Sequence, residues 1–119
     1  MTVLLIEDDE TVRDLLSRVL RNDGYDVLTA ATGAEADEVV HDLPAPLDLL
    51  VCDVCLPGES GPQLADRLSR RFPDLRLLMM SGDPGMHELT NAGPLDAEFL
   101  GKPFSNRQFL ERVRNLLTR

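Results

Sequence analysis

Apolar residues along this chain follow two patterns that alternate. Short continuous apolar runs, bounded by proline, glycine or acidic residues, are typical of strands buried on both faces. Between these runs, apolar residues recur at intervals of three and four positions, which is typical of amphipathic helices. The strands are expected at residues 3–6, 25–30, 47–53, 75–80 and 97–100, each followed by a helical segment.

Capping residues mark several of the expected helix boundaries. Thr32–Glu35 has the capping-box pattern, and Ser60–Gln63 and Ser105–Gln108 begin the third and last helices. Gly24 suits the left-handed position just after the first helix. The stretch 83–94 is rich in proline and glycine, so we expect only two or three helical turns there.

Five strand–helix units in alternation predict an α/β fold. They indicate a single doubly wound (βα)5 domain over residues 1–119, with a parallel sheet and helices on both faces. The familiar five-strand arrangement has the order 2-1-3-4-5, which places the first and third strands side by side. The less apolar second strand is expected at a sheet edge. A chain of 119 residues can form one core and is too short for two.

Composition narrows the class of protein further. A hydrophobic fraction of 43% and a charged fraction of 28% are globular values, which exclude a disordered chain. The net charge of −9 excludes a general nucleic-acid binder, which would carry a basic surface. No apolar stretch approaches the length of a membrane span, and no signal peptide is evident. The expected location is therefore the cytoplasm.

Polar residues stand where the predicted strands end. Glu7 and Asp8 follow the first strand, Asp53 ends the third, Ser81 follows the fourth, and Lys102 follows the fifth. Because the carboxyl ends of parallel strands meet at one edge, these side chains are expected to converge. Crowded carboxylates repel one another unless a cation holds them, and Mg²⁺ prefers oxygen ligands. Lys102 is the one lysine beside eleven arginines, which suggests a use for its compact ammonium.

This combination of groups suits phosphoryl chemistry. A carboxylate beside a divalent cation can act as a nucleophile toward phosphorus, so Asp53 would form an aspartyl-phosphate. The metal ion and Lys102 would neutralise charge on the transferring phosphoryl group. Ser81 would donate a hydrogen bond to a phosphoryl oxygen.

Four segments also carry a resemblance to a known family. Residues 3–9, 53–57 together with Gly61, 81–82 and 99–104 resemble, in order and spacing, the motifs of receiver domains of bacterial two-component response regulators (the CheY-like superfamily). The resemblance covers essentially the whole chain. It implies a phospho-accepting receiver in a phosphorelay that takes a phosphoryl group from a histidine kinase or a phosphotransfer protein. Such a receiver modifies itself and turns over no external substrate, so it is not classed as an enzyme.

The resemblance assigns roles to individual positions of this sequence. It implies that Asp53 is the phospho-acceptor, Asp8 a direct Mg²⁺ ligand, Glu7 its usually water-mediated companion, the Cys55 backbone carbonyl a further Mg²⁺ ligand, Ser81 the switch hydroxyl, Lys102 the phosphoryl-pairing lysine and Phe99 the switch aromatic. The Lys102–Pro103 bond is often cis in the family. Three features are notable against its pattern. Glu7 stands where aspartate is commoner, and the stretch 83–94 is shorter and more broken than usual. Cys55 and Asp83 lie two residues beyond the acceptor and the switch serine, where side chains influence the phosphoryl lifetime in the family, so that lifetime is not predicted here.

Two other functions stay open at this point. A pseudo-receiver would bind partners without being phosphorylated. A Mg²⁺-dependent phosphohydrolase of the haloacid-dehalogenase type needs a second acid two residues after its nucleophile, where this chain has Cys55. The Cys52–Cys55 spacing does not indicate a redox or zinc pair, because Cys52 lies within a strand and not at a helix start. The output protein and a homodimer are left open, whereas no direct contact with nucleic acid or membrane is expected.

Overall fold

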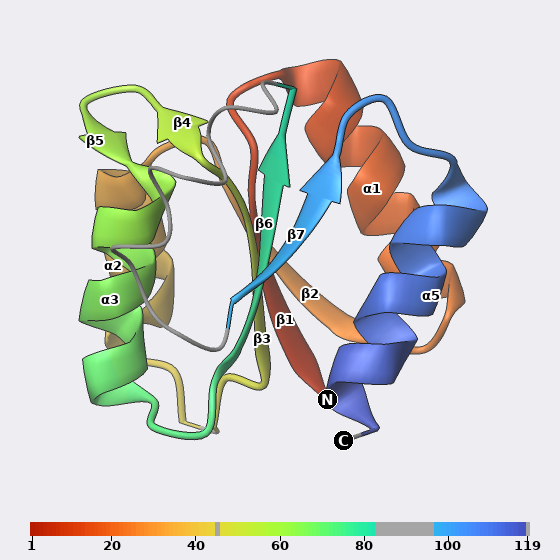
Figure 1. The fold of residues 1–119 in the computed structure, drawn as a ribbon. Coiled ribbons are helices and arrows are strands. Elements are labelled where there is room, and N and C mark those ends of the chain that lie inside the picture. Colours follow the sequence, from red (N-terminus) through yellow and green to blue (C-terminus); the bar gives the residue numbers. More distant parts are fainter. Residues whose placement is uncertain (45, 83–96, 119) are drawn as a thin grey trace.

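Five parallel strands form the central sheet of this protein (Figure 1). The computed structural model describes residues 1–44, 46–82 and 97–118. The sheet has the spatial order β2-β1-β3-β6-β7, which is the predicted 2-1-3-4-5 when only its own strands are counted. Strand β2 lies at an edge, as predicted. The strands are β1 (Thr2–Ile6), β2 (Asp26–Ala30), β3 (Leu49–Asp53), β6 (Arg76–Ser81) and β7 (Glu98–Gly101).

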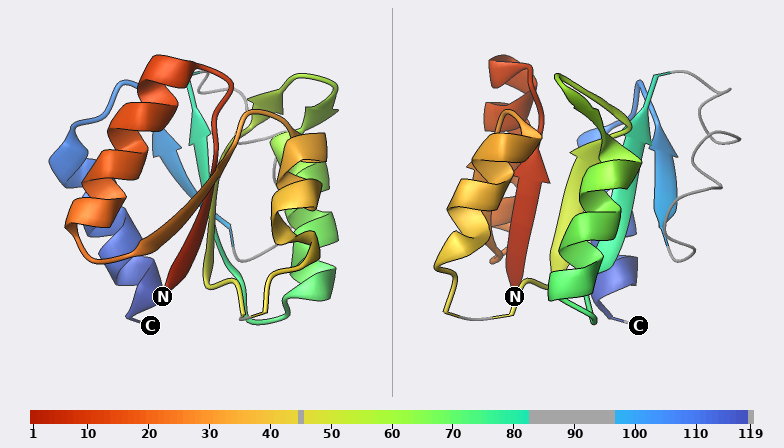
Figure 2. Two further views of the ribbon diagram at one scale, coloured as in Figure 1. Left: turned by 180° about the vertical axis from the view of Figure 1, so that it is seen from behind. Right: turned by 90° about the vertical axis from the view of Figure 1, so that its left-hand side faces the viewer.

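Helices cover both faces of the sheet (Figure 2), so the doubly wound α/β class is confirmed. One face carries α1 (Glu10–Asn22) and α5 (Asn106–Leu117), and the other carries α2 (Gly33–His41) and α3 (Gly61–Arg71). The helix expected within 83–94 lies outside the described residues. Of the helices within those residues, none is long and apolar enough to cross a membrane.

The core has two halves, one on each face of the sheet. In β1, Val3 and Leu5 pack beneath α1 and α5, whereas Leu4 and Ile6 pack beneath α2 and α3. Side chains of a strand point alternately to opposite faces, so a strand covered on both sides is apolar at every position. This is why the strands appear in the sequence as continuous apolar runs.

Capping explains where the helices begin. Ser60 and Ser105 each form a complete capping box with the glutamine three residues later. At Thr32 the predicted box is only half formed, because the Glu35 carboxylate accepts from the N–H of Ala31 rather than from that of Thr32. The backbone conformation also differs at this cap, since the φ of Thr32 is −138°, against −85° and −82° at the two serines.

A small hairpin follows β3 and was not predicted from the sequence. Strands β4 (Cys55–Leu56) and β5 (Glu59–Ser60) pair antiparallel directly before α3. Gly58 lies in the turn with φ of +81°, a conformation that suits glycine. Gly24, likewise, has φ of +93° just after α1, as the sequence predicts. The hairpin places its residues immediately beyond the carboxyl end of β3.

Candidate functional site

The carboxyl ends of β1, β3, β6 and β7 meet at the upper edge of the sheet in Figure 1. The strand pairing aligns their ends, since Ile6 lies beside Cys52 and Asp53 beside Met80. Each polar residue singled out in the sequence is the last residue of one of these strands or comes just after it. Parallel pairing therefore brings together residues that are far apart along the chain.

Three carboxylates converge at this edge, as the sequence predicts. Glu7, Asp8 and Asp53 each offer an oxygen atom, and these atoms all lie within 4.8 Å of one another. Glu7 is only 2% exposed and Asp53 7%, whereas Asp8 is exposed to solvent. Water can therefore screen the charge of Asp8 more effectively than the charges of Glu7 and Asp53. The two buried carboxylates depend on nearby positive charge.

Lys102 supplies one positive charge to the cluster. Its Nζ lies 2.8 Å from Asp53 Oδ1 and 3.4 Å from Glu7 Oε2. One ammonium beside three carboxylates leaves two negative charges uncompensated when all four groups are ionised. The excess equals the charge of one divalent cation, and the ligand atoms are the hard oxygens that Mg²⁺ prefers.

Proton affinities at the site reflect this excess of negative charge. Burial raises the pKa of the Glu7 carboxyl, and hydrogen bonding to Asp53 and the charge of Asp53 raise it further. For Lys102, burial alone would lower the pKa, but the carboxylates of Asp53 and Glu7 together raise it above its ordinary value. The ammonium is therefore stabilised in its charged form, while Glu7 is ionised at an energetic cost.

The backbone around Asp53 is held from several directions. The N–H of Val54 donates to the Met80 carbonyl at 3.0 Å, and the N–H of Gly61 donates to the Val54 carbonyl at 2.7 Å. A Cβ on Gly61 would lie 2.1 Å from the Asp53 carbonyl oxygen, so only glycine lets α3 approach this closely. This role of Gly61 was not recognised from the sequence, where the residue stood out only as part of the family motif.

Arg13 is a second residue that sequence reasoning missed. Its guanidinium donates to the backbone carbonyl of Glu7 at 2.9 Å and so holds the turn between β1 and α1. The N–H of Asp9 donates to the Glu7 carboxylate at 3.2 Å. Arg13 is one of three arginines in an amphipathic helix, with Arg18 and Arg21, and no local pattern distinguishes it from the other two.

Ser81 and Phe99 lie on neighbouring strands of the site. Ser81 is buried at the end of β6, and its carbonyl accepts from the N–H of Lys102 at 2.8 Å. Phe99 pairs with Met79 across the β6–β7 ladder and is half-buried against the core beneath α2 and α3. The positions of both residues are compatible with the switch expected of them, and their roles stay predictions.

The two cysteines occupy opposite environments. Cys52 is buried within β3, where its thiol donates to the Asp53 carbonyl at 3.1 Å and burial raises its pKa strongly. Cys55 lies on β4 with an exposed side chain. Cys55 is close enough in the chain to Asp53 for its carbonyl to face a shared ion, but that role also stays a prediction.

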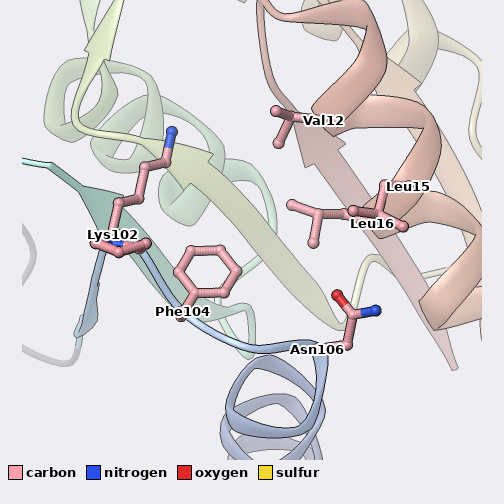
Figure 3. A pocket seen from close by; sticks show the side chains of 7 residues that line it. Val12, Leu15, Leu16, Lys102, Phe104 and Asn106 are labelled. Atoms are coloured by element: carbon pink, nitrogen blue, oxygen red, sulfur yellow. The ribbon is translucent and has the colours of Figure 1, made fainter.

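An open pocket of about 400 Å³ adjoins Lys102 (Figure 3). Side chains of α1 face Phe104 across it, and Leu15 at its rim is 49% exposed. By its spacing from Val12 and Val19, Leu15 belongs to the apolar stripe of α1, but it lies at the edge of that stripe, where it lines the pocket. The Lys102–Pro103 bond at its border is cis. The pocket is lined by Val12, Leu15, Leu16, Lys102, Pro103, Phe104 and Asn106.

Comparison with known proteins gives a consistent result. Residues 3–114 match the family described as response regulator receiver domain. The chain is 39% identical to the sensor kinase CckA of Brucella abortus, over 98% of this chain and 12% of that protein. It is 37% identical to the response regulator MprA of Mycobacterium leprae, over 100% of this chain and 52% of that protein.

A solved structure supports the same fold. The CheY-like response regulator receiver domain protein of Methanospirillum hungatei has a TM-score of 0.85 and 27% identity, over 98% of this chain and 93% of that chain. The curated relatives are much longer, and this chain spans about half of MprA and a small part of CckA.

Proposed function

The chain belongs to the response regulator receiver domain family, and on that premise we propose that it accepts a phosphoryl group on Asp53 from a phosphohistidine, with Mg²⁺ as cofactor. The donor would be a histidine kinase or a phosphotransfer protein. One observation carries the proposal: Lys102 Nζ lies 2.8 Å from the acceptor carboxylate, within a cluster of three converging carboxylates.

The residues present suit a magnesium ion. Side-chain oxygens of Glu7, Asp8 and Asp53 lie within 4.8 Å of one another, and Lys102 compensates only part of their charge. Glu7, Asp8 and Asp53, together with the backbone carbonyl of Cys55, would hold the ion directly or through water. When bound, Mg²⁺ offsets negative charge on the phosphoryl oxygens during transfer.

Asp53 and Lys102 have different roles in the transfer. A carboxylate oxygen of Asp53 attacks the phosphorus atom, the P–N bond of the phosphohistidine breaks, and its electron pair remains on the imidazole. Lys102, which now contacts Asp53 Oδ1, would shift its hydrogen bond to a phosphoryl oxygen and stay protonated throughout. Asp53 is only slightly exposed, so the donor must approach from the edge of the sheet.

Ser81 and Phe99 would couple phosphorylation of Asp53 to a change in the partner-binding surface. The hydroxyl of Ser81 would move to bind a phosphoryl oxygen, and the ring of Phe99 would fill the space that it leaves. Such a change shifts an existing two-state equilibrium by the difference in binding energy between the two states. Phosphotransfer and hydrolysis occur on the chain itself, so in this proposal it is a switch and not an enzyme.

The test is phosphorylation by a small-molecule donor. The protein is incubated with acetyl phosphate and Mg²⁺, and its intact mass is compared with that of the Asp53→Asn variant. We expect one phosphoryl adduct on the wild type that hydroxylamine removes, and no adduct on the variant. An equal adduct on the variant would refute Asp53 as acceptor.

Two other results would favour the alternative functions. A failure to bind Mg²⁺, together with the absence of any adduct, would indicate a pseudo-receiver. Sustained release of phosphate from a small phosphoester would indicate a phosphohydrolase.

A further inference from the structure

We propose that Arg67 and Glu59 are positioning residues for the phosphoryl site, which they support by anchoring the β4–β5 hairpin to α2 and α3. This inference rests on the proposed function, because it concerns how the chain presents the Cys55 carbonyl to Mg²⁺. Neither residue touches the three carboxylates of the site, so their effect would be indirect. The residues were not singled out by the family motifs.

The hairpin needs an external support. Each of its strands has two residues, with Cys55 paired to Ser60 and Leu56 paired to Glu59. A two-stranded hairpin is marginal in water even when it is longer. The hairpin is joined to Asp53 through Val54 alone, so a displacement of β4 moves the Cys55 backbone relative to the acceptor.

One end of the hairpin is fixed by the start of α3. Ser60 is the N-cap of that helix, and its N–H donates to the Gln63 side chain at 3.1 Å. The N–H of Gly61 donates to the Val54 carbonyl at 2.7 Å. These contacts hold the base of the hairpin, but they leave the turn between β4 and β5 to be held by another group.

Glu59 provides that group. Arg67 of α3 donates to its carboxylate through Nη1 at 3.0 Å and through Nη2 at 2.9 Å. The same guanidinium donates to both carboxylate oxygens of Asp37 on α2, at 3.2 Å and 3.1 Å. A planar guanidinium with several fixed donors can bind two carboxylates at once, which an ammonium cannot do in the same geometry.

Gly33, the first residue of α2, leaves space for the Glu59 carboxylate. A Cβ on Gly33 would lie 1.7 Å from Glu59 Oε1, so the absence of a side chain there leaves room for Glu59. The Glu59 side chain is accordingly 21% exposed, compared with 44% for Arg67 and 48% for Asp37. Hydrogen bonding to Arg67 also lowers the pKa of Glu59, so its charge persists in acid. The anchor thus joins the hairpin to two helices.

A second ion pair on α3 offers a matched comparison. Arg70 binds Asp66 at 2.9 Å, but the two residues are four apart on the same exposed helix face. Both pairs join an arginine of α3 to a carboxylate at a similar distance. Only the Arg67 pair reaches the hairpin. Comparing Arg67→Ala with Arg70→Ala therefore separates an effect on the position of the hairpin from a general effect on α3.

The experiment is a titration with MgCl₂ followed by two-dimensional amide NMR. The protein variants are wild type, Arg67→Ala, Glu59→Gln, Arg67→Lys and Arg70→Ala. We expect Mg²⁺ affinity to fall by about 10-fold in Arg67→Ala and Glu59→Gln, a loss typical of residues that orient metal ligands. Arg67→Lys should fall between Arg67→Ala and wild type, and Arg70→Ala should bind like the wild type.

A second measurement distinguishes positioning from loss of the fold. In metal-free Arg67→Ala, the amides of Leu56 and Glu59 should exchange hydrogen faster, while those of Leu50 and Val51 in β3 should be unchanged. Equal acceleration in β3 would mean global destabilisation and would overturn the inference. Wild-type affinity in both Arg67→Ala and Glu59→Gln would overturn it as well.

The Mg²⁺ titration distinguishes failure of the proposed function from failure of this inference. A wild-type protein that binds no Mg²⁺ would overturn the proposed function and this inference with it. Binding by the wild type with no loss in the variants would overturn only the inference.

Discussion

Arginine and lysine make different kinds of contact in this protein, because a guanidinium and an ammonium differ in shape and in the number of donors. Several arginines reach from one element to another, where their donors bind carbonyls or carboxylates with defined directions. Arg13 binds the carbonyl of Glu7, and Arg114 of α5 binds both carboxylate oxygens of Asp23 at the end of α1. Lys102 places a compact ammonium against two carboxylates of the site instead. Lys102, the one lysine of the sequence, is therefore the basic residue whose ammonium lies against the carboxylates of the site.

Gly61 leads to a prediction at the scale of one residue. In Gly61→Ala the new methyl group would lie 2.1 Å from the Asp53 carbonyl oxygen, so either α3 or the end of β3 must move. We expect a loss of about 1–3 kcal/mol in the free energy of unfolding, measured by urea denaturation.

Gly101→Ala is the control for this prediction. A Cβ at Gly101 would meet nothing within 4 Å, so its effect should stay within about 0.5 kcal/mol. Equal stability of the two variants would contradict the close packing of α3 on Asp53.

Helix capping allows a prediction at the scale of an element. Ser105 accepts from the N–H of Gln108 at 3.1 Å, and helix α5 contributes Phe109, Val113 and Leu116 to the core. In Ser105→Ala one N–H of the first turn loses its partner, which should lower the free energy of unfolding by about 1 kcal/mol.

Thr118→Ala removes a hydroxyl at the other end of the same helix, where it donates to carbonyls of the last turn. It should change stability by less than about 0.5 kcal/mol in the same urea denaturation. A loss as large as that of Ser105→Ala would show that the reciprocal box adds nothing particular to α5.

Element by element, the sequence predicts most of the fold because its signals are periodic. Strands buried on both faces and helices with apolar stripes each leave a pattern over several residues, and parallel pairing then places Glu7 and Asp53 together. The β4–β5 hairpin was missed because strands of two residues are too short to show a period. The contact of Arg67 with Asp37 joins residues 30 positions apart and has no local signal. The exposure of Leu15 depends on what lies beside α1, which spacing within the helix cannot reveal.

The uncompensated charge at the sheet edge affects the whole molecule through pH. Because the folded protein raises the pKa of Glu7 above its ordinary 4.5, the folded state binds more protons than the unfolded chain above that pH. Stability contributed by this group therefore falls as the pH rises through the raised pKa. The raised pKa of Lys102 acts only at higher pH, since its contribution is complete below the ordinary value of 10.5.

Glu7→Gln tests this dependence. Without added metal, the wild type should lose more stability than Glu7→Gln as the pH rises above about 4.5, as measured by urea midpoints. Mg²⁺ should reduce the difference, because a cation bound at the site stabilises the ionised carboxylate. Glu38→Gln, which changes an exposed carboxylate of α2, is the matched control. Parallel pH profiles for wild type and Glu7→Gln would contradict the electrostatic account.

Because the sheet divides the core into two halves, the hairpin and the carboxylate of Asp53 are contacted by residues from different layers of the protein. The guanidinium that steadies the hairpin comes from the α2–α3 layer, whereas the lysine beside the acceptor comes from the chain that leads into α5. No side chain is shared between these two supports. A change at Arg67 can therefore alter the position of the hairpin without altering Lys102, whereas a change at Lys102 directly alters the charge beside Glu7 and Asp53.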